Sequence, residues 1–388
     1  MKSPPARALG SRPRLERYWR SGLSTPEQLV WSAAVPAAIL YEAAMAVRAG
    51  FWLIPGLGKK VAGARVISVG NLTVGGNAKT PFTLYLARKL IEHGMRSGIV
   101  SRGFGGTLGS GRAALVSDGQ AVRLSAEEAG DEAVMMARAF DGPVAIARRR
   151  IDAINLLKGL GEVDAVVLDD AFQHLRLARD LNLLLVSAER GFGNGWGLPA
   201  GPMRERLGAA ARADAVVILS PQPGLEPNLT RAQAARLKRM TVLRGLIEPR
   251  ALVYAEPGRW REAPAQSLGG RRILAVSALA DPRSFYAMLR ELEADLVGVL
   301  EYPDHYQYTA SDWQSIWRSA ATVDLVVTTE KDLVKLERFP FPRNSIAALR
   351  LEISMGADEE RLLAMAMGVD RLAPRTAVAA KGGASSGA

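Results

Sequence analysis

A glycine-rich turn that runs into Lys-Thr is the segment of this chain whose residues could do chemistry most directly. Residues 65–80 read RVISVGNLTVGGNAKT, which is a β-branched strand, a turn and the first residues of a helix. In such a turn backbone N–H groups can approach phosphate oxygens, Lys79 reaches the β- and γ-phosphates, and the Thr80 hydroxyl lies on Mg²⁺. The sequence therefore predicts a nucleoside triphosphate site made of Thr73, Val74, Gly75, Gly76, Asn77, Ala78, Lys79 and Thr80.

This turn departs from the usual phosphate-loop pattern, but the residues after it support the prediction. The pattern G-x-x-x-x-G-K-[ST] has glycine where this chain has Thr73 and Ala78. Residues 81–93 have Pro81 in a first turn and apolar side chains on one face, and Gly94 follows them as a helix end signal. The alternative is an ordinary turn between a strand and a helix.

Two adjacent carboxylates follow a second apolar strand. The segment VDAVVLDDAFQH at 163–174 delivers Asp169 and Asp170 at the carboxyl end of that strand. In nucleotide-binding sheets an acid at this place holds Mg²⁺, and a cation also relieves the repulsion between two neighbouring acids. The sequence predicts that Thr80, Asp169 and Asp170 form the metal site. The alternative is that one acid caps the following turn.

Three further segments of the first half carry charged residues whose local context leaves their role open. Asp131 lies at the start of an expected helix, where a helix cap is the simpler explanation. Arg102 lies in the turn SRGFGG, which could lie over phosphates or form a plain loop. The turn-rich stretch LPAGPMRERL at 198–207 holds the charged residues Arg204 and Glu205.

Two segments of the second half are candidates for the same site. His305 is one of only three histidines and lies beside Asp304 in YPDHYQYT, although a lone histidine is structural more often than catalytic. The segment DLVVTTEKD at 324–332 brings Lys331 directly before Asp332, which is out of register with the guanine-reading signature [NT]-K-x-D. Guanine specificity is therefore not expected, and Thr329, Glu330 and Lys331 are expected to shape a cleft or bind substrate.

The elements that must position these residues alternate between apolar strands and helical stretches. This alternation is typical of βαβ units with a mostly parallel sheet. Strands are expected at 65–69, 98–101, 144–147, 164–168, 181–186 and 214–219, then at 272–276, 296–300, 323–328 and 347–351. Helices are expected at 81–93, 127–140 and 150–158, then at 282–292, 310–320 and 358–368.

The length of the chain, 388 residues, predicts two domains. We predict an α/β fold of two α/β/α lobes with a cleft between them, the first a P-loop NTPase-like lobe with a mostly parallel sheet. The stretch PQPGLEPN marks the boundary. The predicted parts are an N-terminus with an apolar helix at 1–60, a P-loop domain at 61–222, a second α/β domain at 223–372 and a small polar, disordered tail at 373–388.

The charge of the chain favours anionic partners. Lysine and arginine total 50 against 39 acids, a net charge of +11, and the chain has no cysteine, which excludes disulfides and thiolate metal sites. No zinc-finger spacing or basic–aromatic interleaving is present, so a nucleic-acid partner is not expected. An anionic membrane surface is the partner that the N-terminus favours, because residues 1–20 carry six basic residues and one acid.

An apolar stretch follows this basic N-terminus. Residues 29–47 read LVWSAAVPAAILYEAAMAV, which is long enough for a marginal transmembrane helix. Glu42 and Pro36 argue against a comfortable span, since a charge near mid-membrane costs about 3 kcal/mol. We expect a helix lodged in the inner leaflet with arginines on headgroups. A secretory signal and a buried helix of the soluble fold are the alternatives.

Taken together, seven segments in order resemble the tetraacyldisaccharide 4′-kinase (lipid A 4′-kinase) family of Gram-negative bacteria. They are VGNLTVGGNAKTP, SRGFGG, GDEA, DDAFQH, LPAGPMRE, PDH and TTEKD, and the resemblance covers roughly residues 25–370. It implies transfer of the ATP γ-phosphate, with Mg²⁺, to the 4′-hydroxyl of an acylated glucosamine disaccharide 1-phosphate lipid, giving lipid IVA. It also implies two α/β/α lobes, a membrane-associated N-terminal helix and a place at the cytoplasmic face of the bacterial inner membrane.

The resemblance also implies roles for individual residues. Lys79 and Thr80 match the phosphate loop, and Asp169 and Asp170 match the Mg²⁺-supporting pair. Asp131 matches the proposed general base, and His305 matches the histidine that tunes it. Arg204 and Glu205 fall in the segment that lines the cleft, and Arg102 is expected to contact substrate. The chain departs from the common family pattern at Ala78, Phe104, Ala133 and Ala171.

Two other classes of protein share some of these features. A membrane-recruited P-loop ATPase acting as a switch or chaperone would keep the loop and the acid pair but need neither a base nor an acceptor cleft. A non-catalytic basic surface-binding protein would use the loop for anions alone. The GDEA and PDH segments favour the kinase.

Overall fold

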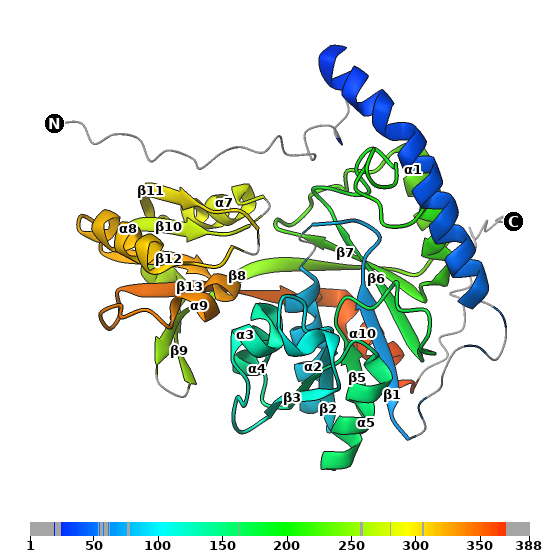
Figure 1. Ribbon diagram of the computed structural model, residues 1–388, viewed down its shortest axis with the longest axis horizontal. Coiled ribbons are helices and arrows are strands. Elements are labelled where there is room, and N and C mark those ends of the chain that lie inside the picture. The colour runs from blue at the N-terminus through cyan, green and yellow to red at the C-terminus, as the bar shows by residue number, and fades with distance from the viewer. Residues whose placement is uncertain are drawn as a thin grey trace, which may run out of the picture.

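The computed structural model (Figure 1) describes residues 19, 25–52, 54, 57, 61, 63–75, 78–161, 163–256, 259–279, 281–304 and 306–369. Several predicted residues lie outside these ranges: the basic residues of 1–17, Gly76 and Asn77 of the phosphate loop, His305, and the tail at 373–388.

One mixed sheet of 13 strands runs through the described part of the chain. Its order is β11-β10-β12-β13-β8-β7-β6-β1-β5-β2-β4-β3, with β9 paired to β8. The strands are β1 (Arg65–Gly70), β2 (Ser97–Ser101), β3 (Ala114–Asp118), β4 (Pro143–Ile146), β5 (Ala165–Leu168), β6 (Leu181–Ser187), β7 (Ala215–Ser220), β8 (Val242–Glu256), β9 (Arg259–Pro264), β10 (Arg272–Ser277), β11 (Asp295–Glu301), β12 (Leu325–Thr329) and β13 (Ile346–Ser354).

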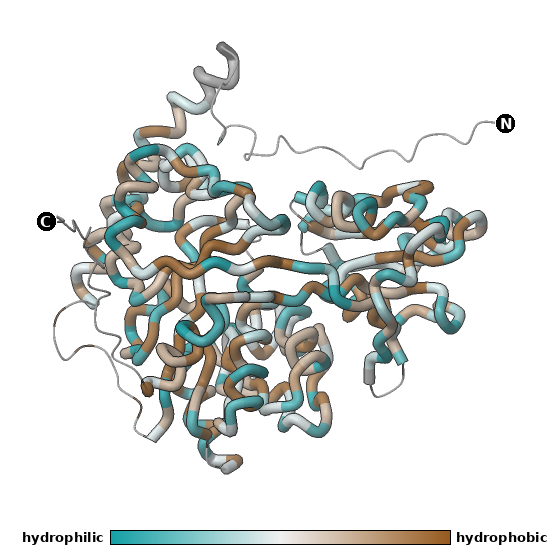
Figure 2. Tube along the Cα trace, turned by 180° about the vertical axis from the view of Figure 1, so that it is seen from behind, coloured by the Kyte–Doolittle hydropathy of each residue, from teal (hydrophilic) through white to brown (hydrophobic). Residues whose placement is uncertain are grey.

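Helices cover this sheet, and most strand pairs are parallel, as βαβ connections require. The helices are α1 (Thr25–Trp52), α2 (Lys79–Glu92), α3 (Ala126–Ala129), α4 (Asp131–Ala139), α5 (Arg150–Leu160), α6 (Arg231–Leu237), α7 (Arg283–Glu291), α8 (Ala310–Ala320), α9 (Glu330–Leu336) and α10 (Glu359–Met367). Figure 2 shows the hydrophobic residues concentrated along the central strands and the hydrophilic residues on the outer turns. The predicted α/β fold is confirmed.

The long strand β8 joins the two predicted lobes (Figure 1). Its first residues, Val242–Leu246, pair in parallel with β7 of the first lobe. Its later residues, Leu246–Val253, pair antiparallel with β13 of the second lobe. The two lobes therefore share one sheet, and a single hydrophobic core cluster contains Ile67 of β1 and Ile346 of β13.

The C-terminal helix returns to the first lobe. The Tyr85 hydroxyl of α2 donates to Glu359 of α10 at 2.7 Å, and Arg65 donates to the carbonyl oxygens of Met365 and Ala366 at 2.9 and 2.6 Å. The predicted division after residue 222 stays a prediction, and the packing places α10 and the first half of β8 with the P-loop lobe.

The helix expected at 127–140 is two helices. Gly130 separates α3 from α4 with a φ of +88°, a conformation that side chains disfavour. A Cβ at this position would also collide with the carbonyl oxygen of Phe104. The break makes Asp131 the first residue of α4, where its side chain is positioned by a new helix start.

Helix α1 lies along the outside of the first lobe (Figure 1). One face binds the segment 196–206: the Trp31 Nε1–H donates to the Ala200 carbonyl at 2.9 Å and the Tyr41 hydroxyl to the Arg204 carbonyl at 3.0 Å. The Glu42 carboxylate accepts from the Gly197 N–H at 2.7 Å and pairs with Arg206. The Glu42 charge, which argued against a membrane span, is thus buried between α1 and the segment 196–206.

The other face of α1 is apolar and exposed. Leu40 and Val47 are 73% and 76% exposed, and Ile39 and Phe51 are also exposed. Within the described residues, Trp31–Trp52 is the one helical stretch long and apolar enough, by length and composition, to cross a membrane.

Candidate active site

The phosphate loop lies between the carboxyl end of β1 and the start of α2. Thr73 pairs with Met203, and the Val74 N–H donates to the Pro202 carbonyl at 2.8 Å, so the loop is fastened to the segment 196–206. Ala78, directly before the helix, has φ +50° and ψ +31°. This left-handed conformation costs alanine about 1–2 kcal/mol relative to the right-handed one, which explains the glycine of the usual pattern.

The Lys79 ammonium group contacts two side-chain oxygens. Its Nζ lies 3.3 Å from Asn71 Oδ1 and 3.3 Å from Asp170 Oδ1. Arg204 Nη1 lies 3.0 Å from both carboxylate oxygens of Asp170. Burial tends to raise the pKa of Asp170, but Lys79 and Arg204 outweigh it and hold that pKa below its usual value. The structure therefore brings together Lys79, Asp170 and Arg204, all of them predicted site residues.

Asp169 faces a different environment from its neighbour. It is 2% exposed, and its carboxylate accepts from the Thr83 hydroxyl at 3.3 Å. Burial is the main cause that raises the pKa of Asp169 to about 7, and the charges of Glu132 and Asp170 add to it. A cation bound nearby would favour the ionised form of this buried acid.

The residues fit a magnesium ion that is bound together with a nucleotide. Mg²⁺ is commonly held by one or two carboxylates, the phosphate oxygens of the substrate and waters. The described residues contain no group of three histidine, cysteine or acidic side chains that could hold a metal by itself. Asp169 and Asp170 follow β5 beside β1, and Thr80 is in the first turn of α2, so this donor set suits a metal completed by phosphate.

Asp131 faces the second lobe across the interface between α4 and α9. Its Oδ1 accepts from the Glu132 N–H at 3.0 Å, and its Oδ2 lies 3.5 Å from Nζ of Lys335 on α9. Lys335 also lies 3.2 Å from Asp332. All three of Asp131, Lys335 and Asp332 are buried, so the predicted base is enclosed by an ion pair from the other lobe.

A second cross-lobe ion pair lies beside the first. Lys331 Nζ lies 3.3 Å from Glu132 Oε1 and 3.5 Å from Asp304 Oδ1. Burial tends to lower the pKa of Lys331, but Glu132, Asp131 and Asp304 outweigh it and the pKa is raised. Asp304 thus brings the loop after β11 to the start of α4. The predicted contact of its neighbour His305 with Asp131 stays a prediction, because residue 305 lies outside the described ranges.

The other two predicted substrate residues differ in their placement. Arg102 is exposed in the loop after β2. Glu205 is 4% exposed, and both its carboxylate oxygens accept from Arg212 at 2.8 Å. The guanidinium of Arg212 also lies over the Phe172 ring at 5.0 Å. A substrate contact of Glu205 therefore stays a prediction that this geometry does not favour.

Replacing Glu205 by glutamine is expected to destabilise the fold by about 3 kcal/mol, because it leaves the Arg212 charge in place without its carboxylate. Urea unfolding of the variant and the wild type would measure the difference. If Glu205 instead binds substrate, the variant would keep its stability and show a higher KM for the acceptor.

Sequence reasoning missed several residues of this site. Asn71 and Thr83 hold Lys79 and Asp169, and Arg150 donates to the Asp169 carbonyl at 3.4 Å. Lys335 was missed because α9 was not predicted. The sequence did contain a signal for this helix, because a threonine followed three residues later by an acid, here Thr329 and Asp332, is typical of a helix start. In the structure the Thr329 hydroxyl accepts a hydrogen bond from the Asp332 N–H at 3.1 Å.

A phosphate loop at the carboxyl edge of a mostly parallel sheet, with an acid pair directly after the adjacent strand, defines a nucleotide-binding protein of the P-loop class. A family model described as tetraacyldisaccharide-1-P 4′-kinase matches residues 30–367. The chain belongs to this family, and the resemblance drawn from its motifs is confirmed.

Relatives and a solved structure agree with this assignment. A Pelobacter propionicus protein named tetraacyldisaccharide 4′-kinase is 39% identical over 83% of this chain and 89% of its own length. A Geobacter metallireducens protein of the same name is 40% identical over 80% of this chain and 89% of its own length. The crystal structure of Aquifex aeolicus LpxK in complex with ATP is 29% identical, with a TM-score of 0.71 over 87% of this chain and 99% of that one.

Proposed function

We propose that this chain is a lipid kinase that transfers the γ-phosphate of ATP to the 4′-hydroxyl of tetraacyldisaccharide 1-phosphate, giving lipid IVA. Family membership and the names of the relatives support this activity. The observation that carries it is the arrangement of Lys79 against Asp170 and Arg204, with Asp131 at an adjacent helix start facing the second lobe.

Positioning and charge neutralisation would do most of the catalytic work. Phosphoryl transfer passes through a loose transition state, so the protein has little covalent chemistry to do. On ATP binding Lys79 would leave Asp170 for the β- and γ-phosphates, and Arg204 would keep the Asp170 carboxylate oriented. Thr80, Asp169 and Asp170 would hold Mg²⁺, which neutralises charge on the phosphates.

Asp131 would accept the proton of the sugar hydroxyl as the new O–P bond forms and the bond between the γ-phosphorus and the β–γ bridging oxygen breaks, releasing ADP. A positioned base contributes about 10²–10⁴-fold to such a step. Asp131 is only 5% exposed and is paired with Lys335, so the acceptor reaches it when the contact between α4 and α9 opens. His305, the next residue in the sequence after Asp304, is the residue that would orient Asp131 from the second lobe.

The acceptor requires the enzyme to work at a membrane. Each buried CH₂ of an acyl chain contributes about 0.8 kcal/mol, so a tetraacylated lipid stays in the bilayer. The exposed apolar face of α1 and the net charge of +11 suit the anionic surface of the inner membrane on its cytoplasmic side.

Replacing Leu40 and Val47 together by aspartate is expected to release most of the protein from anionic lipid vesicles, because it places two charges on the exposed apolar face of α1. Co-sedimentation with the vesicles measures this. The matched control replaces Val297 and Val299, exposed on β11 of the other lobe, in the same way. Equal binding of both variants would remove α1 as the membrane contact.

Acceptor dependence of ATP turnover separates the kinase from the switch ATPase that shares its loop. A kinase of this kind consumes ATP rapidly only when tetraacyldisaccharide 1-phosphate is present. The rate of ADP formation should therefore rise on adding that lipid and stay low with a phospholipid of equal charge. Equal rates with and without the acceptor would favour the switch.

A further inference from the structure

A second cation contacts the predicted phosphate loop, and the proposed reaction gives it no role. Arg190 lies in the turn ERGFGNG that follows β6. A Cβ added to Gly75 of the loop would lie 3.2 Å from Arg190 Nη1, which is closer than side chains ordinarily approach. Because Gly75 has no side chain, the guanidinium has room against the backbone of the loop.

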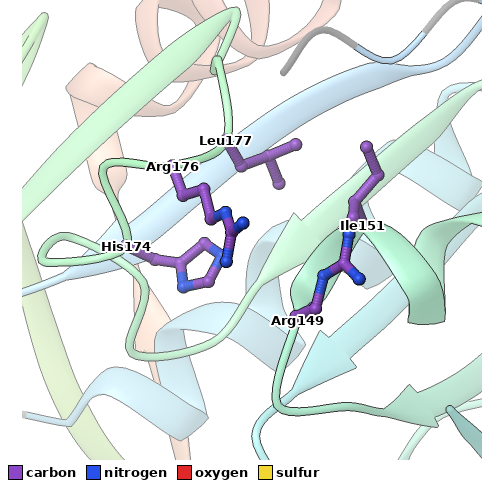
Figure 3. A pocket seen from close by; sticks show the side chains of 5 residues that line it. All are labelled: Arg149, Ile151, His174, Arg176 and Leu177. Atoms are coloured by element: carbon purple, nitrogen blue, oxygen red, sulfur yellow. The ribbon is translucent and has the colours of Figure 1, made fainter. Parts of the chain in front are cut away.

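The sheet places Arg190 on the opposite side of the loop from the acid pair. β6 pairs in parallel with one side of β1, and β5, which ends directly before Asp169 and Asp170, pairs with the other side. The residues of the pocket in Figure 3 follow β4 and β5 and so belong to the side of the acids; they are Arg149, Ile151, His174, Arg176 and Leu177. A nucleotide on the loop would meet the two acids from one side and Arg190 from the other.

Hydrogen bonds fix the backbone that carries Arg190. The carbonyl oxygens of Ala188 and Glu189 accept from the backbone and side-chain N–H groups of Asn228 at 2.8 and 3.3 Å. The Arg190 carbonyl accepts from the Gly193 N–H at 3.1 Å. Because three successive carbonyls are bound, the turn presents the Arg190 side chain from a defined backbone position. Less conformational entropy is then lost when the side chain binds a ligand.

The second lobe supplies a carboxylate that pairs with Arg190. Asp281, between β10 and α7, has its Oδ2 3.4 Å from Arg190 Nη2. The same carboxylate accepts from Nε and Nη2 of Arg283 at 2.8 and 2.5 Å. The hydrogen bond from the Arg283 side chain, with the charge of Arg190 as a smaller cause, lowers the pKa of Asp281 to about 2, although burial opposes the shift. Asp281 would therefore stay paired and ionised if Arg190 turned to another anion.

Arg190 and Lys79 share one arrangement at the two sides of the loop. Each cation rests against a carboxylate, Asp170 for Lys79 at 3.3 Å and Asp281 for Arg190 at 3.4 Å. Each carboxylate also has a second arginine partner, which is Arg204 for Asp170. Phosphate oxygens can therefore replace the carboxylate at either cation without leaving that carboxylate unpaired.

We propose that Arg190 binds the phosphate groups of ATP and that Asp281 is the carboxylate it exchanges for them. This inference rests on the proposed function and adds a phosphate-contacting residue to it. A guanidinium offers paired N–H donors to phosphate oxygens, and an arginine supplied by the chain itself can stabilise the charge of a phosphoryl group in transfer. The Arg190 side chain is 34% exposed, so a ligand can reach it. The competing explanation is that the pair of Arg190 and Asp281 only ties the two lobes together.

Two substitutions separate phosphate binding from a tie between the lobes. Arg190→Gln removes the guanidinium, whereas Asp281→Asn breaks the same ion pair and keeps the guanidinium. In equilibrium titrations with Mg·ATP, Arg190→Gln should weaken binding by about 10–10²-fold, the loss expected for a hydrogen bond to a charged group. Asp281→Asn should bind ATP as tightly as the wild type or more tightly, because no carboxylate competes with the phosphates. Arg190→Lys, which keeps the charge, should recover part of the loss.

Steady-state kinetics give a second readout on the same variants. Arg190→Gln should lower kcat/KM for ATP by at least the factor lost in binding, while KM for the lipid acceptor stays near wild type. Arg318→Gln is the matched control. Arg318 is exposed on α8 and donates only to Gln314 and Ser315 of its own helix among the contacts described, so its loss should change neither quantity.

The opposite outcomes are distinct. Equal losses of ATP affinity in Arg190→Gln and Asp281→Asn would overturn the phosphate contact in favour of a tie between the lobes. Wild-type affinity in Arg190→Gln would overturn it outright. If the wild type itself binds no Mg·ATP, the proposed function fails, and the contact fails with it.

Discussion

Lys79→Met is expected to lower kcat/KM by about 10²–10³-fold, the loss that follows removal of one preorganised donor to a developing charge. The Lys79 ammonium lies 3.3 Å from Asp170, and Lys79 begins α2 directly after the predicted phosphate loop. A methionine keeps the length of the side chain but cannot neutralise the β- and γ-phosphates. Steady-state kinetics with saturating lipid acceptor, varying ATP, measure the effect.

The matched control for this prediction is Lys89→Met on the same helix. Lys89 pairs with Glu92 and Glu359 at 3.0 and 3.2 Å, away from the loop, so its loss should leave kcat/KM near wild type. Lys79→Met should also be more damaging than His305→Ala. The reverse order would contradict the assignment of Lys79 to the phosphates.

Asp131→Asn is expected to lower kcat by about 10²–10⁴-fold while the affinity for ATP stays near wild type, because a base acts on the acceptor and not on the nucleotide. The fold should tolerate the change. Lys335, which would lose Asp131, keeps Asp332 at 3.2 Å and therefore stays paired in the buried interface. Single-turnover kinetics and a separate ATP-binding titration distinguish the two quantities.

Glu127→Gln is the control for Asp131→Asn. Glu127 on α3 pairs with Arg338 at 2.8 Å, so the control also removes one carboxylate that bridges the lobes, but at an exposed position. Its kcat should stay near wild type. A collapse of ATP binding in Asp131→Asn would mean that Asp131 is a ligand or a structural cap and not a base.

Local sequence signals predicted the elements that build the nucleotide site. β1 and α2 form where a β-branched run and a helical period flank the glycine turn, and β5 ends at Leu168, directly before the two predicted acids. These signals depend on neighbouring residues alone. They located Lys79, Asp169 and Asp170, which the parallel pairing of β1 with β5 then brings together.

Other features depend on tertiary contacts that no local pattern encodes. β8 was not predicted because its residues are only partly buried and include Pro249, and its pairing with both β7 and β13 decides its conformation. The role of Lys335 depends on the packing of α9 against α4. The burial of Glu42 likewise depends on the segment 196–206, which is distant in sequence from α1.

The proposed phosphoryl transfer is tested most directly by locating the γ-phosphate of ATP after the reaction. The purified protein is incubated with Mg²⁺, tetraacyldisaccharide 1-phosphate and ATP labelled at the γ-phosphate, and the label is then located. A lipid kinase built on Lys79 and Asp131 leaves the label on the 4′-position of the glycolipid. Label found only as inorganic phosphate, formed equally well without the lipid, would contradict it.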